Sequence, residues 1–321
     1  MRPEVMAEWM QRQDYSVLRT SSSYWFEILP HIYQAFPYHW CINPSRDELD
    51  HLWKVKQAIA LRYSSPLWAP SGKLSYHVVF PNNGEKFLLE KIPKKPRHDI
   101  KKGLRNFHVD QISLSSLACE GWQVRLETLA RQRRLKAESQ KWWVELCQNA
   151  ANLPGFEAWA AFFDEGMAAS VLVARCDDHA YILYQQSRTC CLRLGVNNTL
   201  AYVVSSSLLE DPGITRIFYG LQSLDAKPGV DQFKFRMGFL PKPVRQVVLF
   251  HPVLAPLIQT PVYKTIMGIR KFFPGSILSK AGGMMNFYLE GKKPLAEQQW
   301  PGILANQKAG IHALEFIHEP I

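Results

Sequence analysis

A short segment in the second half of the chain combines a cation, a glycine and small polar residues. It reads Arg193-Leu194-Gly195-Val196-Asn197-Asn198-Thr199 and stands at a predicted strand-to-helix junction. The first N–H groups of a helix lack intrahelical acceptors, and the helix dipole adds positive charge there, so this turn suits a phosphate. The residues predicted to bind the anionic part of a cofactor are Arg193, Gly195, Val196, Asn197 and Asn198. A purely structural turn with an Asn cap is the alternative.

A second segment places aromatic, amide and charged side chains around a strand end and the helix after it. It reads Tyr219-Gly220-Leu221-Gln222-Ser223-Leu224-Asp225, then Gly229-Val230-Asp231-Gln232-Phe233-Lys234-Phe235-Arg236-Met237-Gly238-Phe239. This run resembles the Fem-type branch of the GNAT acyltransferases, which includes the peptidoglycan aminoacyl transferases. In that branch an aromatic-Gly pair ends a strand, and a Gly-(Leu/Val)-x-x-Phe-Lys helix leads into Gly-Phe. The resemblance covers roughly residues 20–250.

The resemblance implies acyl transfer, in which an amine attacks an acyl group held as a thioester or as an ester on tRNA. Such a site must bind the carrier, align the two reactants and stabilise the developing oxyanion. It implies that the Lys234 cation stabilises the oxyanion or holds the acceptor, and that Tyr219 and Gln222 face the same cleft. We therefore predict Lys234, Tyr219 and Gln222 as catalytic residues. The alternatives are an ion pair between Lys234 and Asp231 and a plain sheet position for Tyr219.

The sequence shows no unambiguous general base. The candidate carboxylates are Asp225, Asp231 and Glu157, and helix capping or solvation is the favoured role for each of them. Proton removal then falls to water or to the carrier. We assign Asp225 to substrate binding.

The densest basic stretch runs from Lys91 to Arg105, with seven cations and one acid, Asp99. Three cations at four-residue spacing share one face of a predicted helix and are predicted to bind substrate: Arg97, Lys101 and Arg105. The apolar face of the same helix is predicted to carry Ile100, Leu104 and Phe107. A basic patch attracts phosphates, acidic headgroups or RNA, and a solvated helix face is the alternative. The stretch also resembles the basic helix of the Fem-type branch.

The elements that position these residues follow from hydrophobic periodicity. Predicted helices cover residues 45–63, 97–107, 115–134, 138–150, 194–210 and 229–238. Predicted strands cover residues 74–80, 86–89, 157–163, 167–175, 180–185, 214–220 and 244–250. The order from residue 157 is β-β-β-α-β-α-β, which is similar to that of the GNAT fold.

We therefore predict an α/β (α+β) protein with two tandem GNAT-type lobes and mixed central sheets. The predicted domains are a partial, degenerate N-terminal lobe (1–113), an acyltransferase lobe (114–250) and a basic, proline-containing extension (251–321). The extension is expected to pack on the surface or to lie at a membrane interface.

Composition excludes several other classes of protein. Of 321 residues, 47% are hydrophobic and 21% charged, which excludes wholesale disorder, and the net charge of +10 favours anionic partners. No helix-turn-helix, zinc-finger or RNP-type pattern points to DNA. The six cysteines form no C-x-x-C, so we expect reduced thiols and no metal. Without a signal peptide or an apolar run of about 18 residues, we expect a cytoplasmic protein, with peripheral attachment at the inner membrane as an option.

Three functions stay open, and the first is our prediction. It is an N-acyltransferase that uses acyl-CoA or an acyl carrier protein on a small-molecule or lipid-linked amine. The second is an aminoacyl-tRNA-dependent transferase, because Arg193-x-Gly195 departs from the usual Gln/Arg-x-x-Gly-x-Gly/Ala loop and leaves another carrier open. The third is a non-enzymatic protein that docks on an anionic membrane surface through residues 91–105 and 262–280.

Overall fold

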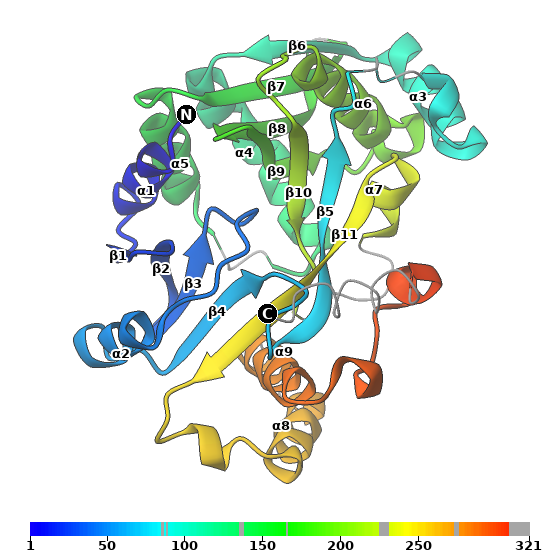
Figure 1. Cartoon of the computed structure of the whole chain (residues 1–321). Coiled ribbons are helices and arrows are strands. Elements are labelled where there is room, and N and C mark those ends of the chain that lie inside the picture. The colour runs from blue at the N-terminus through cyan, green and yellow to red at the C-terminus, as the bar shows by residue number, and fades with distance from the viewer. Residues whose placement is uncertain are drawn as a thin grey trace. The chain divides into compact units, whose positions relative to one another are not determined.

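The chain divides into two compact units by its internal contacts. The computed structural model describes residues 1–84, 87, 89–134, 138–164, 166–224, 231–272 and 276–307, and Figure 1 labels the elements. Unit 1 consists of Met1–Asp14, Val78–Gly220 and Gln232–Leu240, and unit 2 of Tyr15–His77, Leu221–Asp231 and Pro241–Ile321. The predicted domains 1–113, 114–250 and 251–321 are contiguous segments, unlike these units, and the division of the chain into them stays a prediction.

Unit 1 contains a mixed sheet with strand order β5-β10-β9-β8-β7-β6. Its strands are β6 (His108–Ile112), β7 (Phe156–Phe163), β8 (Gly166–Cys176), β9 (His179–Ser187) and β10 (Arg216–Leu221), and β5 (Lys73–Pro81) begins in unit 2. Its helices are α1 (Pro3–Gln11), α3 (Lys94–Asn106), α4 (Leu114–Arg131), α5 (Gln140–Ala151), α6 (Val196–Leu209) and α7 (Gln232–Arg236). Strands β6 to β9 pair antiparallel, and β10 pairs with β9 in parallel. The predicted meander over residues 157–185 is confirmed as β7, β8 and β9.

Helices cover both faces of strand β8. Sequence neighbours such as Val171, Leu172 and Val173 are all buried. Because successive side chains of a strand point to opposite faces, both faces of β8 must be covered. Both α4 and α6 contact this strand. The buried aliphatic side chains of α6 include Val196, Leu200, Val204 and Leu208.

Unit 2 contains a second mixed arrangement of strands, with the order β1-β2-β3-β4-β11-β5. Its strands are β1 (Val17–Arg19), β2 (Tyr24–Leu29), β3 (Ile32–Phe36), β4 (Ala60–Ser65) and β11 (Leu240–Phe250). Its helices are α2 (Arg46–Val55), α8 (Thr260–Phe272) and α9 (Ser276–Gly291). Strands β3 and β4 are parallel, whereas β11 runs antiparallel to β4.

Helices also cover both faces of strand β11. Val247 belongs to a core cluster with Trp53 of α2, whereas Val248 belongs to another with Phe287 and Tyr288 of α9. Neighbouring strand residues point to opposite faces, so α2 and α9 pack on opposite sides of β11. The C-terminal segment therefore supplies a core helix of unit 2.

Helix α2 is shorter than predicted. It begins with a capping box, in which the Glu48 N–H donates to Ser45 Oγ at 3.2 Å and the Ser45 N–H donates to Glu48 Oε2 at 3.1 Å. It ends at Val55, and β4 begins at Ala60, so the predicted extension of this helix to residue 63 is wrong. Every residue of β4 is buried, and pairing with β3 and β11 overrides the local helical pattern.

Two predicted elements fall partly outside the described residues. Of the predicted strand 86–89, residues 86 and 88 lie outside, and Leu89 begins a short 3-10 helix, Leu89–Lys91. The helix predicted for 229–238 is described from Asp231 onward and appears as α7. Among the described residues, no helix is both long and apolar enough to cross a bilayer.

Candidate functional site

The parallel pairing of β9 and β10 stops partway along both strands. The last paired residues are Phe218 and Tyr181, yet β9 continues to Ser187 and β10 to Leu221. Residues 182–185 and 219–221 are half-buried, whereas Phe218 and Tyr181 are fully buried. The two strands therefore separate within unit 1, and their side chains become accessible at this point.

Tyr219 lies just beyond the last strand pair, and its contacts include the side chains of Gln185, Phe239 and Lys234. Its hydroxyl donates a hydrogen bond to Gln185 Oε1. The ring of Phe239 meets it edge-on, with ring centroids 5.2 Å apart. The Lys234 ammonium nitrogen lies 4.7 Å from the Tyr219 ring centroid, where the ring quadrupole attracts a cation. The structure thus brings together two of the residues that the sequence singled out.

Gln185 connects Tyr219 with the first turn of α6. Its side-chain N–H donates to the carbonyl oxygen of Asn197 at 3.3 Å. Gln185 is not among the residues that the sequence predicts for the site. The one available signal is an amide in a largely apolar strand, because an amide that is shielded from water needs hydrogen-bond partners. That signal does not identify the partners.

Helix α3 approaches the first turn of α6 through two glycines. Gly195 precedes α6 with a left-handed φ of 83°, and an added Cβ there would overlap the Asp99 carbonyl oxygen. An added Cβ on Gly103 would overlap the hydroxyl of Thr199. The basic helix therefore packs directly against the predicted phosphate turn.

The first turn of α6 keeps free hydrogen-bond donors. In the described part of the chain, no group accepts a hydrogen bond from the N–H of Val196, Asn197 or Asn198, and no side chain caps the helix. Asn197 Oδ1 is buried without a hydrogen-bond partner there. Arg193 is exposed beside the turn, and its carbonyl oxygen accepts from Lys102 Nζ at 3.0 Å. Such a set of donors can hold an anion.

The cations of α3 have different surroundings. Arg97 donates to the carbonyl oxygens of Glu90 at 2.6 Å and Ile92 at 2.8 Å, so it fixes the turn before the helix. Lys101 and Arg105 are exposed on the surface of unit 1. The substrate-binding role of all three cations stays a prediction.

The apolar face of α3 differs from the predicted one at one position. Leu104 is 45% exposed, so its predicted place on the packed face is wrong. The packed positions are Pro96, Ile100, Gly103 and Phe107. The reason is that Gly103, lacking a side chain, allows the closest approach to α6 and turns Leu104 outward.

Gln222 belongs to unit 2, whereas Tyr219 and Lys234 belong to unit 1. Its Oε1 accepts a hydrogen bond from Ser75 Oγ at 2.8 Å, and its carbonyl oxygen accepts from Arg62 Nη2 at 3.2 Å. Its catalytic assignment stays a prediction. Asp225 lies outside the described residues.

Two candidate carboxylates have structural partners. Glu157 forms an ion pair with Arg175, which also pairs with Asp211. Asp231 accepts a hydrogen bond from the Tyr76 hydroxyl at 2.9 Å. Burial and the neighbouring Asp231 carboxylate raise the pKa of Tyr76. Both carboxylates therefore contact protein side chains, and their role in the reaction stays a prediction.

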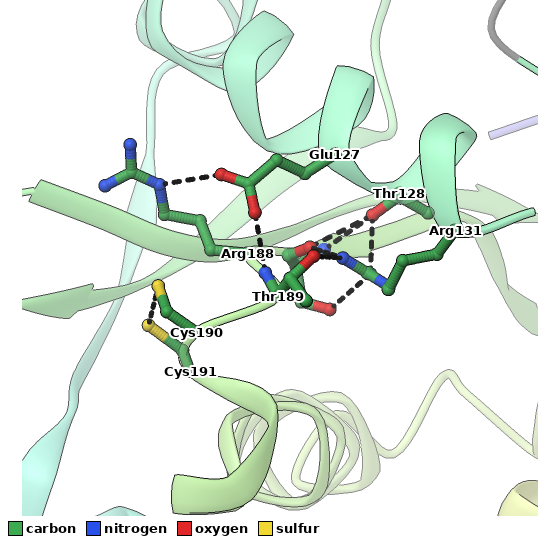
Figure 2. A network of polar contacts seen from close by, with 8 residues as sticks. Glu127, Thr128, Arg131, Arg188, Thr189, Cys190 and Cys191 are labelled. Atoms are coloured by element: carbon green, nitrogen blue, oxygen red, sulfur yellow. Dashed lines mark hydrogen bonds and ion pairs between the residues drawn. The ribbon is translucent and has the colours of Figure 1, made fainter.

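A polar network fixes the end of β9 to α4, as Figure 2 shows. Arg131 Nη1 donates to the Ser187 carbonyl oxygen at 2.7 Å, and the Thr189 N–H donates to Glu127 Oε2 at 2.7 Å. Next along the chain are Cys190 and Cys191, with sulfur atoms 3.6 Å apart. The 3-10 helix Leu192–Leu194 and then α6 follow directly. The network therefore holds the segment that leads into the predicted phosphate turn.

Comparison with known proteins identifies the fold. No family model and no curated protein matches the chain. The crystal structure of FemX is similar with a TM-score of 0.53 and 10% identity, over 79% of this chain and 93% of that chain. The C-terminal domain (DUF2156) of a putative lysylphosphatidylglycerol synthetase from Agrobacterium fabrum has a TM-score of 0.52 and 14% identity, over 76% and 87%. The chain has a Fem-like, GNAT-type fold.

The predicted α/β class and the resemblance to the Fem-type branch are thereby confirmed at the level of the fold. A tandem GNAT protein from the clavulanic acid biosynthesis pathway is also similar, with a TM-score of 0.44 and 12% identity, over 73% of this chain and 81% of that chain. At these identities the likeness concerns the fold alone.

Proposed function

We propose that this protein is an N-acyltransferase whose reaction takes place in unit 1. The observation that carries the proposal is a continuous series of contacts from Lys234 through Tyr219 and Gln185 to Asn197. This series gathers a cation, a hydroxyl group and the free N–H donors of a helix start. An acyl-transfer site needs these groups to hold a carrier and to stabilise an oxyanion.

In the proposed reaction the amine nitrogen attacks the carbonyl carbon of a thioester. The C–N bond forms, the C–S bond breaks, and the proton lost by the amine passes through water to the departing thiolate. The first-turn N–H groups of α6 and the Arg193 guanidinium hold the phosphates of acyl-CoA or of an acyl carrier protein. The Lys234 ammonium stabilises the oxyanion, and Tyr219 keeps that ammonium in place.

The acyl donor is identified first by its effect on thermal stability. A ligand that binds only the folded protein raises the unfolding midpoint by mass action. The ligands to compare are coenzyme A, acyl-CoA species of increasing chain length and aminoacyl-tRNA. The donor found in this way is then assayed with a panel of sugar, amino acid and lipid-linked amines, by release of the free carrier.

Lys234→Ala tests the proposed reaction centre. Removing a group that stabilises the oxyanion lowers the rate about 10²- to 10³-fold, so we expect a loss of this size with an unchanged circular dichroism spectrum. The matched control is Lys141→Ala, because Lys141 is an exposed lysine of α5 whose ion pair with Glu145 spans 3.8 Å. A folded Lys234→Ala protein with the wild-type transfer rate would remove Lys234 from the mechanism.

An aminoacyl-tRNA-dependent transferase is the second candidate. Its supporting observation is that α3, with exposed Lys101, Lys102 and Arg105, packs against the first turn of α6. The name of one similar structure, a lysylphosphatidylglycerol synthetase, also fits an aminoacyl group and a lipid acceptor. Retention of tRNA should fall steeply with salt and weaken further in Lys101→Gln/Arg105→Gln. Absence of retention at low salt argues against tRNA.

An anionic membrane surface is a further proposed partner, consistent with peripheral attachment. The exposed Leu104 lies among the cations of α3, and such a mixture suits an acidic lipid interface. Flotation with anionic liposomes tests this, and Leu104→Ser should reduce the bound fraction. Equal flotation with neutral liposomes would contradict an electrostatic attachment.

A further inference from the structure

A pocket of about 400 Å³ lies in unit 2 beside strand β11. Its volume falls within the range of pockets that bind small molecules. Apolar residues of β11 and α9 dominate its lining, including Val248, Phe250, Phe287 and Tyr288. The acyl-transfer proposal does not use this pocket, because all of its lining residues belong to unit 2 and the proposed reaction belongs to unit 1.

Two lysine ammonium groups lie over aromatic rings that line the pocket. Lys73 Nζ is 5.0 Å from the Phe287 ring centroid, and Lys292 Nζ is 4.0 Å from the Tyr288 ring centroid. Lys292 is exposed and itself lines the pocket. The apolar cavity thus has one lysine in its lining, Lys292, and a second, Lys73, against the ring of the lining residue Phe287.

Lys73 is the more informative of the two lysines. The residue is only 7% exposed, yet no other described residue accepts a hydrogen bond from its ammonium group or forms an ion pair with it. The nearby Glu290 carboxylate pairs with Lys293 instead. Burial lowers the pKa of Lys73, and Glu290 opposes this change. The ammonium nitrogen is not among the buried polar atoms that lack a partner. An anion bound beside it would be attracted by a charge that is only partly hydrated.

We propose that this pocket binds a single-chain anionic amphiphile. The alkyl chain fills the space beside Val248, Phe250 and Phe287, and a carboxylate or phosphate headgroup pairs with the ammonium groups of Lys73 and Lys292. A fatty acid and a single-chain phosphate share this chemistry. The proposal concerns binding to unit 2, so it is tested separately from acyl transfer.

Titration calorimetry of the full-length protein with ligands of increasing alkyl length tests whether the pocket binds the alkyl chain. The probes are carboxylates, monoalkyl phosphates and alcohols of 8 to 12 carbons, each kept below its aggregation concentration. Burial of one methylene group corresponds to about a fourfold gain in affinity, so this increment is expected in all three series. Both anionic series should bind more tightly than the alcohols. The tighter of the two identifies the source of the headgroup.

Two substitutions separate the contribution of the headgroup to binding from that of the alkyl chain. Lys73→Met keeps the apolar stem and removes the charge, so the preference for an anion over an alcohol should fall about tenfold or more while the increment per methylene persists. Ala255→Trp places a large side chain at a lining position and should weaken binding of the longest carboxylate more than about tenfold. The matched control is Lys54→Gln, because Lys54 is an exposed lysine of α2 in the same unit. It should bind like the wild type.

Three results would overturn the proposal. The first is the absence of binding by any anionic probe, and the second is equal affinity for alcohols and carboxylates. The third is unchanged binding by a folded Ala255→Trp protein. If Lys73→Met does not fold, Lys292→Gln provides the charge test on an exposed residue, and an unchanged preference for anions in that variant counts against the headgroup position.

Discussion

The Lys234 ammonium nitrogen lies 4.7 Å from the centre of the Tyr219 ring, while the hydroxyl of the same ring is hydrogen-bonded to Gln185. Tyr219 therefore contacts Lys234 with its ring face and Gln185 with its hydroxyl group. Its face holds a cation of α7, and its hydroxyl reaches β9 and, through Gln185, the first turn of α6. The two contacts can be removed one at a time.

A double-mutant cycle should detect the contact between Tyr219 and Gln185 without any substrate. Tyr219→Phe keeps the ring face and loses only the hydroxyl, and Gln185→Leu removes the acceptor. We expect a coupling free energy of about 0.5–1.5 kcal/mol in urea unfolding, the usual net contribution of one hydrogen bond. The control pairs Tyr219→Phe with Gln132→Leu at an exposed position after α4 and should give no coupling. Coupling below about 0.3 kcal/mol for the test pair would contradict the hydrogen bond.

Alanine substitutions of Gly103 and Gly195, at the contact between α3 and α6, should lower the free energy of unfolding by different amounts. Gly103→Ala overlaps the side chain of Thr199, and such overpacking costs about 1–3 kcal/mol. Thr199→Ala in the same protein should recover part of this loss, because it removes the overlapping hydroxyl and leaves Cβ at 3.0 Å. Gly195→Ala should lower the unfolding free energy by more than Gly103→Ala. The added Cβ would overlap the backbone of Asp99, and residue 195 has a left-handed φ that disfavours alanine.

The measurement for these glycine variants is the free energy of unfolding in urea. Gly268→Ala serves as the control, because this helical glycine of α8 has nothing within 4 Å of an added Cβ. It should be neutral or slightly stabilising. Full rescue of Gly195→Ala by Thr199→Ala would show that the contact between α3 and α6 has been assigned to the wrong atoms.

The capping-box carboxylate should give a stability difference that depends on pH. Burial raises the pKa of Glu48, but hydrogen bonds from Thr20, Ser22 and Ser45 outweigh it and lower the pKa from 4.5 to about 2. A lowered pKa stabilises the fold above the unfolded value, and this stability is lost as pH falls through the folded value. The difference in unfolding free energy between wild type and Glu48→Gln should therefore shrink from pH 4.5 to pH 2. A constant difference over this range would contradict the assignment.

Thiol reagents should distinguish the two adjacent cysteines. Cys190 and Cys119 are exposed, whereas Cys191 is buried, and burial together with a hydrogen bond to Cys190 raises the pKa of Cys191 to about 11. Burial raises the pKa of Cys147 and Cys176 to about 12. Since the thiolate is the reactive form, iodoacetamide at neutral pH should modify Cys119 and Cys190 first. Peptide mass spectrometry measures this, and rapid labelling of Cys191 in the folded protein would count against the arrangement.

Local patterns predicted those parts of the fold that depend on neighbouring residues. The sequence points to the Arg193–Asn198 turn because a glycine and small polar residues precede a helix, and to the Lys234 segment because its motif is continuous in the chain. The functional role of both segments stays a prediction. Gln185 was missed because its partners come from a different strand and helix. Leu104 was placed on the wrong face because apolar spacing does not show that a glycine makes the closest contact.

Long-range strand pairing explains why α2 ends earlier than the sequence predicts. Residues 60–63 belong to the predicted helix, and only pairing with β3 and β11 makes them part of a strand. β11 lies far along the chain, so no window of the sequence contains both partners. Contacts of this kind decide where an element ends, whereas capping residues such as Ser45 mark where α2 begins.

The interleaving of the two units restricts when the protein can fold during synthesis. The chain passes between the units after residues 14, 77, 220, 231 and 240. Unit 1 lacks its last stretch until residue 240 has left the ribosome, and unit 2 needs α9 beyond it. Neither unit can therefore be completed before most of the polypeptide has been translated, and a gene fragment with a single start and stop cannot encode either one without part of the other.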